Sequence, residues 1–246
     1  MKPEFDVLIP ARLESTRLPG KPLLEIGGKP LIRHAWESAE LSGAASVTIA
    51  TDATSVRDAA ARFCPNLEMT SASHSSGTDR IAEVVRRRGL PDDRIIVNVQ
   101  GDEYGLPPQV VDQVAALLAG DGEAAMATLC EPIRNEAEWR DPNVVKVVCT
   151  PDGLAQDFSR VPDPAARFAP DRVFRHIGIY AYRAGFLLRF TQLPPTARER
   201  TERLEQLRAL ENGYRIRVAV ACAPAGIGVD SPADLERARR LEQARV

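Results

Sequence analysis

The sequence predicts an α/β protein with a mostly parallel central sheet that is covered by helices on both faces. Two observations support this prediction. Short apolar runs recur along the chain, and they are continuous rather than alternating, which is typical of strands buried on both faces. Stretches with helical periodicity separate these runs, and a repeated strand–helix order is typical of parallel sheets.

The predicted elements follow one another in this order over the first 148 residues. Strands are expected at the continuous apolar runs, which cover 6–10, 46–50, 94–99, 124–128 and 144–148. Helices are expected where apolar residues recur at helical spacing, which covers 30–41, 55–63, 79–88 and 110–118.

The second half has a different pattern. Residues 153–160 and 175–183 form longer predicted strands, and the turn signal Pro151-Asp152-Gly153 favours a hairpin. A helix is predicted over 201–211, closed by Asn212-Gly213, and a strand follows over 215–220. The last helix begins at Ser231-Pro232, a favourable N-cap and first helical residue. The proline-rich residues 161–170 are predicted to form a loop, so we expect one domain with an inserted sheet-like part.

Composition excludes several classes of protein. The 246 residues suffice for a large buried core, and 44% apolar with 27% charged residues exclude global disorder. The net charge of −2 gives no basic excess for nucleic acid, and no apolar run approaches the ~20 residues of a membrane span. Because the N-terminus lacks a signal-peptide pattern, we expect a cytoplasmic protein. The four cysteines form no CxxC pair and are predicted to be core residues.

The loop after the first predicted strand has the composition of a phosphate-binding loop. Ligands of open α/β sheets bind beyond the carboxyl ends of the strands, where this loop lies. Arg12, Ser15, Arg17, Gly20 and Lys21 supply cations, a hydroxyl and accessible backbone amides within ten residues. The alternative is a solvated basic loop. Neither a P-loop nor a GxGxxG fingerprint follows this strand, so the two best-known phosphate motifs are excluded.

Two aspartates are candidate metal ligands. Asp102 follows Gln100-Gly101 at the end of the strand 94–99, and Asp230 directly precedes the last helix. Mg²⁺ needs only one or two protein carboxylates when phosphates and water supply the other ligands. The alternative for Asp230 is an acid that stabilises the positive end of the helix dipole.

Polar residues of the second half could face a second substrate. His176, Gly178 and Tyr180 share one face of a predicted strand, because side chains alternate along a strand. Glu205 and Gln206 flank an apolar helical stripe. The alternative for His176 is a purely structural role, and the alternative for Glu205 and Gln206 is an ordinary polar helix face.

The chain resembles the 3-deoxy-manno-octulosonate (Kdo) cytidylyltransferases, also called CMP-Kdo synthetases, over nearly its whole length. The matching stretches are PAR..STRLPGKPL (10–23), ATD (50–52), H.SGT.R (74–80), VNVQGDE (97–103), MATL (126–129), NVVKVV (143–148), FSR (158–160), RHIGIYAYR (175–183), LEQLRALENG (204–213) and GVDSP.DLER (228–237). RLPGKPL and NVQGDE are specific to this family, whereas the sialic acid synthetases have SK in place of STR.

The resemblance implies a single-domain nucleotidyltransferase fold, related to the Rossmann fold, over 1–246. Its nucleotide-binding part would cover about 1–130 and 215–246. Its acceptor part, about 131–214, would contain an inserted smaller sheet through which two copies form a homodimer. The reaction would be CTP plus Kdo giving CMP-Kdo plus pyrophosphate, with Mg²⁺ as the cofactor.

The resemblance also implies a role for individual residues. Arg12, Ser15, Arg17 and Lys21 would hold the triphosphate, with Arg12 and Lys21 also catalytic. The segment 71–77 would line the cytosine, chiefly through Ser71, Ala72, Ser76 and Gly77. Gln100 would lie between nucleotide and acceptor, and Asp102 and Asp230 would carry Mg²⁺. The acceptor would face Arg160, His176, Tyr180, Glu205 and Gln206.

Departures from the family pattern leave the acceptor open at this stage. Residues 73–78 read SHSSGT where the family usually has DHQSGT, and Tyr104-Gly105 replaces the proline that usually follows GDE. The residues after FSR also differ. The alternatives are therefore a different acidic acceptor, such as a modified ulosonate or a small phosphonate like phosphonoformate. A non-catalytic nucleotide-sensing protein is a third possibility, which the intact Lys21, Asp102 and Asp230 disfavour.

Overall fold

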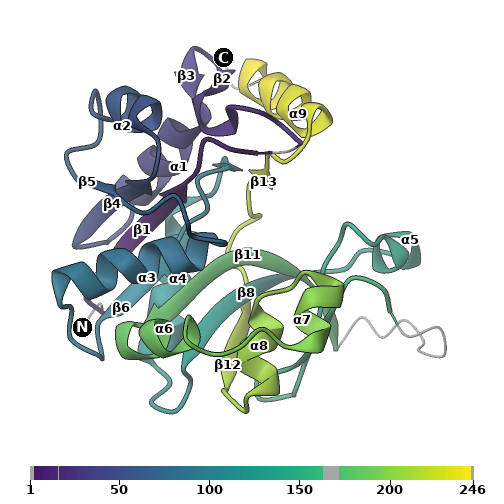
Figure 1. Cartoon of the computed structure of the whole chain (residues 1–246). Helices are drawn as coiled ribbons and strands as arrows, with labels where there is room; N and C mark the ends of the chain where they lie inside the picture. The colour runs from purple at the N-terminus through teal and green to yellow at the C-terminus, as the bar shows by residue number, and fades with distance from the viewer. Residues whose placement is uncertain (1–2, 16, 163–171, 245–246) are drawn as a thin grey trace.

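A nine-stranded mixed sheet forms the centre of the protein (Figure 1). The structure is a computed structural model that describes residues 3–15, 17–162 and 172–244. The main path through the sheet runs β10-β9-β11-β6-β1-β4-β5, and β8 and β12 extend it on the other side of β11. The predicted α/β class is confirmed.

The parallel part of the sheet comes from the first half of the chain. β1 (Phe5–Ala11) lies between β4 (Ser46–Thr51) and β6 (Ile95–Asn98), and β5 (Leu67–Met69) pairs with β4, all in parallel. Every residue of β1 is buried, as its continuous apolar run predicts. Because β1 and β6 run the same way, the residues that follow them meet at one edge of the sheet.

Helices cover both faces of this parallel part. Residues of α1 (Leu31–Glu40), α2 (Thr54–Ala60) and α4 (Pro108–Ala119) pack in the apolar cluster on one face, and residues of α3 (Gly77–Arg88) pack on the other. These four helices confirm the predicted ones to within two or three residues at each end. The apolar periodicity therefore located all four helices, and only α3 has a side-chain N-cap, at Ser76.

The strands of the second half are arranged on both sides of the long strand β11 (Val173–Arg183). One side of β11 pairs with β8 (Met126–Pro132) and the other with β6 and β9 (Lys146–Cys149), all antiparallel. The predicted hairpin is confirmed by β9 and β10 (Ala155–Ser159). β12 (Ile216–Val220) runs parallel to β8, and one bridge connects Leu154 to Arg217 beside β10. The insert is thus continuous with the main sheet through β11.

The prediction of one continuous helix over 201–211 is wrong. The chain forms α7 (Ala197–Glu202) and α8 (Gln206–Glu211), separated at Arg203, whose φ of 54° lies in the left-handed region. A buried ion pair joins the two helices, because Arg208 Nε donates to Glu199 Oε2 at 2.9 Å. Two short helices, α5 (Glu136–Arg140) and α6 (Ala184–Phe190), complete this half.

The C-terminal helix packs on the N-terminal loop, although the two are far apart in sequence (Figure 1). α9 (Pro232–Gln243) begins with the predicted Ser231 cap, whose side chain accepts from the Asp234 backbone N–H. It contacts the small hairpin of β2 (Glu25–Ile26) and β3 (Lys29–Pro30). A separate antiparallel pair, β7 (Glu103–Tyr104) with β13 (Ile227–Gly228), leads into α9.

Two expectations meet the limits of the described residues. Residues 163–170 of the predicted proline-rich loop lie outside them. Within them, no helix combines the length and apolar character needed to cross a membrane.

Candidate active site

A cleft of about 750 Å³ lies at the carboxyl ends of β1 and β6, where the strand order predicts a ligand site. Residues from four distant segments line it: Pro10, Ala11, Arg12, Leu13, Glu14, Ser15, Arg17, Pro19, Gly20, Lys21, Pro22, Ser76, Gly77, Arg80, Gln100, Gly101, Asp102 and Asp230. Most of the residues predicted to bind the nucleotide and metal are therefore brought together here.

Lys21 lies between the two predicted metal ligands. Its ammonium donates to Asp102 Oδ2 in a short contact and to Asp230 Oδ1 at 2.9 Å. Burial alone would lower the pKa of Lys21, but the charge of Asp102 and its hydrogen bonds outweigh burial and raise it. Burial opposes ionisation of Asp230, yet the Lys21 and Arg17 contacts lower its pKa. Lys21 and Asp230 are thus held in their charged forms.

Two glycines explain why the carboxylates converge. A Cβ on Gly101 would lie 2.8 Å from the carbonyl oxygen of Pro10, so only glycine lets this turn cross β1 and aim Asp102 into the cleft. A Cβ on Gly226 would lie 2.1 Å from the carbonyl oxygen of Tyr104, so glycine is required where the chain approaches β7. The Val229 N–H then donates to the Asp102 carbonyl at 3.0 Å, which places Asp230 beside Asp102.

The basic loop is open toward the cleft. Arg12 is exposed, and the Arg17 side chain is 67% exposed although it contacts Asp230 Oδ1 at 3.0 Å. Ser15 Oγ accepts from the Leu18 backbone N–H at 3.3 Å, and Gly20 adopts the left-handed φ of 68° that begins the turn to Lys21. The loop therefore presents two exposed guanidinium groups and one anchored ammonium to an anion.

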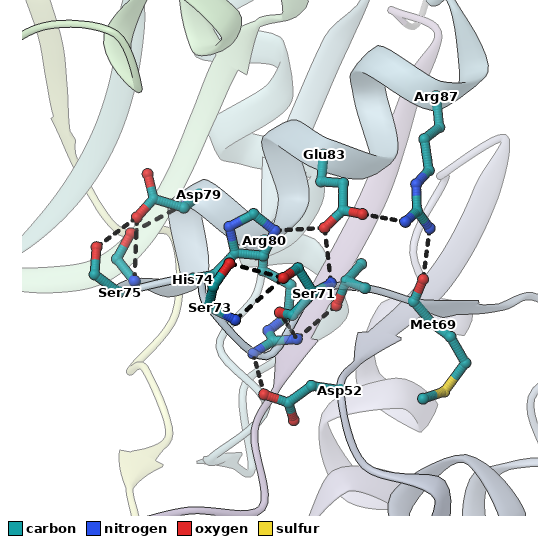
Figure 2. A network of polar contacts seen from close by, with 12 residues as sticks. Asp52, Met69, Ser71, Ser73, His74, Ser75, Asp79, Arg80, Glu83 and Arg87 are labelled. Atoms are coloured by element: carbon teal, nitrogen blue, oxygen red, sulfur yellow. Dashed lines mark hydrogen bonds and ion pairs between the residues drawn. The ribbon is translucent and has the colours of Figure 1, made fainter.

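A buried arginine to which the sequence alone assigned no role, Arg80, also lines the cleft. The Arg80 side chain on α3 is 3% exposed and forms an ion pair of 2.6 Å with Asp52 (Figure 2). It also donates to Thr70 Oγ1 at 2.5 Å. Arg80 and Asp52 occur in the stretches H.SGT.R and ATD, which match the family pattern. This match was the sequence signal that could have identified both residues.

The segment 71–77 divides into two parts. Ser76 and Gly77 line the cleft, whereas Ser71 and Ala72 lie outside its lining. Glu83 on α3 anchors this segment, because it accepts from the Ser71 backbone N–H at 2.9 Å and from His74 in a short contact (Figure 2). Burial opposes ionisation of Glu83, but these hydrogen bonds and Arg87 lower its pKa, so its anchoring charge persists.

Glu205 connects the nucleotide cleft to the second predicted group of residues. Thr78 Oγ1 donates to Glu205 Oε2 at 2.5 Å, and Ser76 of the cleft lining also hydrogen-bonds to this carboxylate. Burial raises the pKa of Glu205 against these hydrogen bonds. The neighbouring Gln206 is buried, and its Nε2 has no hydrogen-bond partner among the residues that the structure describes. An unpaired buried amide is costly, which favours a ligand or water at this place.

His176 and Tyr180 line up on β11, as the strand periodicity predicts. Their rings lie 5.3 Å apart, and the His176 ring also contacts Phe158 at 5.2 Å. His176 Nε2 lies 2.9 Å from Thr128 Oγ1, whose proton is directed at the Ile179 carbonyl at 2.7 Å, so the imidazole is the donor. Burial lowers the pKa of His176 to about 3, which keeps it neutral.

Arg160 lies at the end of β10 and is fixed by its neighbours. Its Nε donates to the Glu202 carbonyl at 2.8 Å. Its own carbonyl accepts from the fully buried Lys146, which also donates to the carbonyls of Asp141 and Val144 at 2.9 and 2.7 Å. Lys146 therefore connects residues 141–144, which precede β9, to Arg160, which we expect to bind the acceptor.

Comparisons with known proteins agree with this arrangement. A family model described as Cytidylyltransferase matches residues 7–216. The 3-deoxy-manno-octulosonate cytidylyltransferase of Pseudomonas fluorescens (strain SBW25) is 53% identical and covers 98% of this chain and 99% of its own length. That of Pseudomonas syringae pv. tomato (strain ATCC BAA-871 / DC3000) is 52% identical over 99% of this chain and 100% of its own.

Solved structures show the same relationship. A CMP:2-keto-3-deoxy-manno-octonic acid synthetase complexed with CTP is 42% identical, with a TM-score of 0.91 over 99% of this chain and 100% of that one. A putative glucose-1-phosphate thymidylyltransferase from Bacillus anthracis, 17% identical with a TM-score of 0.69 over 97% of this chain and 95% of that one, shares the fold. The chain belongs to the 3-deoxy-manno-octulosonate cytidylyltransferase family of cytidylyltransferases.

Proposed function

We propose that this protein transfers the cytidylyl group of CTP to Kdo and releases pyrophosphate. The observation that carries the proposal is the convergence of Lys21, Asp102 and Asp230 in a cleft lined by a basic loop. Relatives with more than half of their residues identical are named for this reaction. The different acceptors considered from the sequence, including a small phosphonate, are not favoured by these relatives.

CTP would lie across the cleft. Arg12, Ser15, Arg17 and Lys21 would bind its triphosphate, because exposed guanidinium groups and an ammonium suit phosphate oxygens. The segment 71–77 would line the cytosine, with Ser76 and Gly77 closest to the cleft. Gln100, whose amide oxygen lies beside Gly77, would contact both substrates.

Asp102 and Asp230 would hold Mg²⁺. Both carboxylates already converge on one cation, the Lys21 ammonium, so the donor set fits a cation between them. Two carboxylates with phosphate and water are a typical Mg²⁺ environment. When bound, the ion would neutralise phosphoryl charge and lower the pKa of the attacking hydroxyl.

Kdo would lie between the cleft and β11. Arg160 carries the cation for its carboxylate, and His176, Tyr180 and Gln206 are neutral groups able to orient it. Glu205, which contacts Ser76 and Thr78, would accept from a sugar hydroxyl. The acceptor hydroxyl would then lie near the α-phosphate.

The chain would act mainly by positioning and by electrostatics. The acceptor hydroxyl attacks the α-phosphorus in line, and Lys21 offsets the charge that develops as pyrophosphate leaves. None of the described residues has to serve as a general base if the bound ion acidifies the hydroxyl.

Pyrophosphate release tests this function directly. We expect release with CTP, Kdo and Mg²⁺, and at least tenfold less with UTP, because wrongly paired buried polar groups cost about 1–3 kcal/mol. Lys21→Met should abolish turnover. The matched control is Lys29→Met, since Lys29 pairs with Glu37 outside the cleft lining and should be dispensable. Absence of release with Kdo from the folded protein would refute the proposal.

The acceptor part, about 131–214, would also form the homodimer. Light scattering of the purified protein would test this, with twice the 26.9 kDa chain mass as the expected result. Unpaired cysteines are typical of a reducing compartment, which supports a cytoplasmic location.

A further inference from the structure

Two cysteines share a cavity whose lining is separate from that of the cleft. Cys130 on β8 and Cys149 on β9 are both free thiols, and both belong to the apolar cluster that also contains Val218. They line one cavity of about 280 Å³ together with residues of β12 and the β9–β10 turn. Neither residue belongs to the active-site cleft or to the predicted acceptor group.

The cavity opens to solvent beside β12. Val220 pairs with Cys130 in the β8–β12 register and is 47% exposed. The edge of the cavity is therefore formed by the exposed end of β12. Cys149 is 9% exposed and Cys130 is 2% exposed, which makes Cys149 the thiol nearer to solvent. A small neutral reagent can therefore reach Cys149 first.

The two thiols interact with each other. Cys130 Sγ lies 3.5 Å from the Ala219 carbonyl oxygen, and the Cys130 thiol also hydrogen-bonds to the sulfur of Cys149. That hydrogen bond lowers the pKa of Cys149 against the opposing effect of burial, and raises the pKa of Cys130. Arg172 also lines the cavity.

We propose that Cys130 and Cys149 form a peroxide-sensitive thiol pair that closes to an intrachain disulfide. The Cys149 thiolate attacks one oxygen of hydrogen peroxide, the O–O bond breaks, and a sulfenic acid and water form. The Cys130 sulfur then attacks the sulfenic sulfur, an S–S bond forms, and a second water leaves. Two thiols are oxidised and one peroxide is reduced to two waters.

This disulfide would connect β8 to β9 across the cavity. β9 begins with Lys146, which fixes the backbone of Arg160. Oxidation would therefore stiffen the part of the chain that supports the acceptor group, and a thiol reductant would reverse it. Such reversible disulfides are the kind expected in a reducing compartment.

Peptide mass mapping of the wild-type protein tests the proposal without any variant. The protein is treated with hydrogen peroxide, and its remaining thiols are then alkylated in denaturant. We expect a Cys130–Cys149 cross-linked peptide that is ~2 Da lighter than the sum of the two reduced peptides and that disappears with dithiothreitol. Alkylation of Cys64 and Cys222 should be unchanged. If Cys130 and Cys149 remain fully alkylated while Cys222 is oxidised, the proposal is wrong.

Variants assign the order of the two steps. In Cys130→Ser, the sulfenic acid on Cys149 should persist and be trapped by dimedone, because its partner thiol is missing. Cys222→Ser is the matched control and should still give the cross-link, since Cys222 is exposed and lies outside this cavity lining. A cross-link that involves Cys64 or Cys222 instead would also overturn the assignment.

Discussion

The Lys21 ammonium donates a hydrogen bond of 2.9 Å to the Asp230 carboxylate, across 209 positions of the sequence. The same ammonium contacts Asp102, so one positive charge serves two negative ones in a partly buried cleft. The free protein thus already holds a cation where we propose that Mg²⁺ binds. Lys21 and the metal ion would compete for the same carboxylates until a triphosphate offers Lys21 another partner.

Removal of this ammonium should increase metal affinity in the protein without nucleotide. In Lys21→Met the two carboxylates lose their common partner and only Arg17 still contacts Asp230, so a divalent ion meets more of their negative charge. We expect Mn²⁺, detected by electron paramagnetic resonance, to bind at least fivefold more tightly to Lys21→Met than to the wild type, although turnover is lost. Lys29→Met should bind as the wild type does. Unchanged or weaker Mn²⁺ binding in Lys21→Met would contradict the competition.

Substitution of Asp230 tests whether this residue is a metal ligand or an acid that only stabilises the last helix. Asp230→Asn keeps the shape of the side chain and removes its charge, so turnover should fall by about 100-fold, as for loss of a strong electrostatic contact. The control is Asp234→Asn, because Asp234 accepts from the Ser231 backbone N–H at 2.9 Å and caps α9. That variant should lose stability and keep most of its turnover. Near-normal turnover of Asp230→Asn at saturating Mg²⁺ would leave Asp230 with the helix role alone.

Much of the fold could be predicted because its signals are local. The continuous apolar runs located β1, β4 and β6, and Ser231-Pro232 located the start of α9. The break between α7 and α8 could not be predicted, because it occurs at Arg203, and a non-glycine residue seldom adopts positive φ. Tertiary contacts such as the Arg208–Glu199 ion pair stabilise that break, and no local pattern reports them.

The site was predicted unevenly for a similar reason. The composition of the loop after β1 identified an anion site, but the pairing of Asp102 with Asp230 depends on Gly226 approaching β7, which is a long-range event. Arg80 was missed because an arginine on a helix is usually solvated. Only the fold brings Asp52 and Thr70 to it and buries its charge.

Arg80 offers a test of that buried charge. Arg80→Met should destabilise the protein by about 3 kcal/mol, because it leaves Asp52 uncompensated in a site where Asp52 is 18% exposed. Urea unfolding of the double variant Arg80→Met/Asp52→Asn should show most of that stability restored. If the single and double variants are equally unstable, the loss comes from packing and the ion pair is unimportant.

The partly buried imidazole of His176 predicts a loss of stability in acid. Its pKa is about 3 in the folded protein and about 6.5 in an unfolded chain, so the unfolded state binds the extra proton between these values. Stability contributed by the neutral ring is therefore fully present above pH 6.5 and falls as the pH is lowered toward 3. His176→Gln should show a shallower decrease in the free energy of unfolding between pH 7 and pH 5. A wild-type His176 ring signal that titrates near pH 6.5 by NMR would refute the premise.

Glu205 provides the sharpest test of the acceptor. Its carboxylate accepts from Thr78 at 2.5 Å, and the adjacent Ser76 lines the nucleotide cleft, so Glu205 lies where the two substrates would meet. Glu205→Gln replaces a charged acceptor by a neutral one, and hydrogen bonds to charged groups are worth about 1.5–3 kcal/mol. We therefore expect kcat/KM for Kdo to fall by roughly 10- to 100-fold, with the KM for CTP nearly unchanged.

Glu205 is the N-cap residue of α8, and its matched control is Glu211→Gln at the other end of that helix. Glu211 lies 3.7 Å from Arg198 and outside the cleft lining, so its loss should leave both KM values unchanged. Comparison of the two variants separates a local contact with the sugar from a general weakening of α8, because a weakened helix would affect both. If Glu205→Gln instead raises the KM for CTP and leaves that for Kdo unchanged, Glu205 serves the nucleotide through Ser76 and Thr78, and the sugar hydroxyl must have another partner.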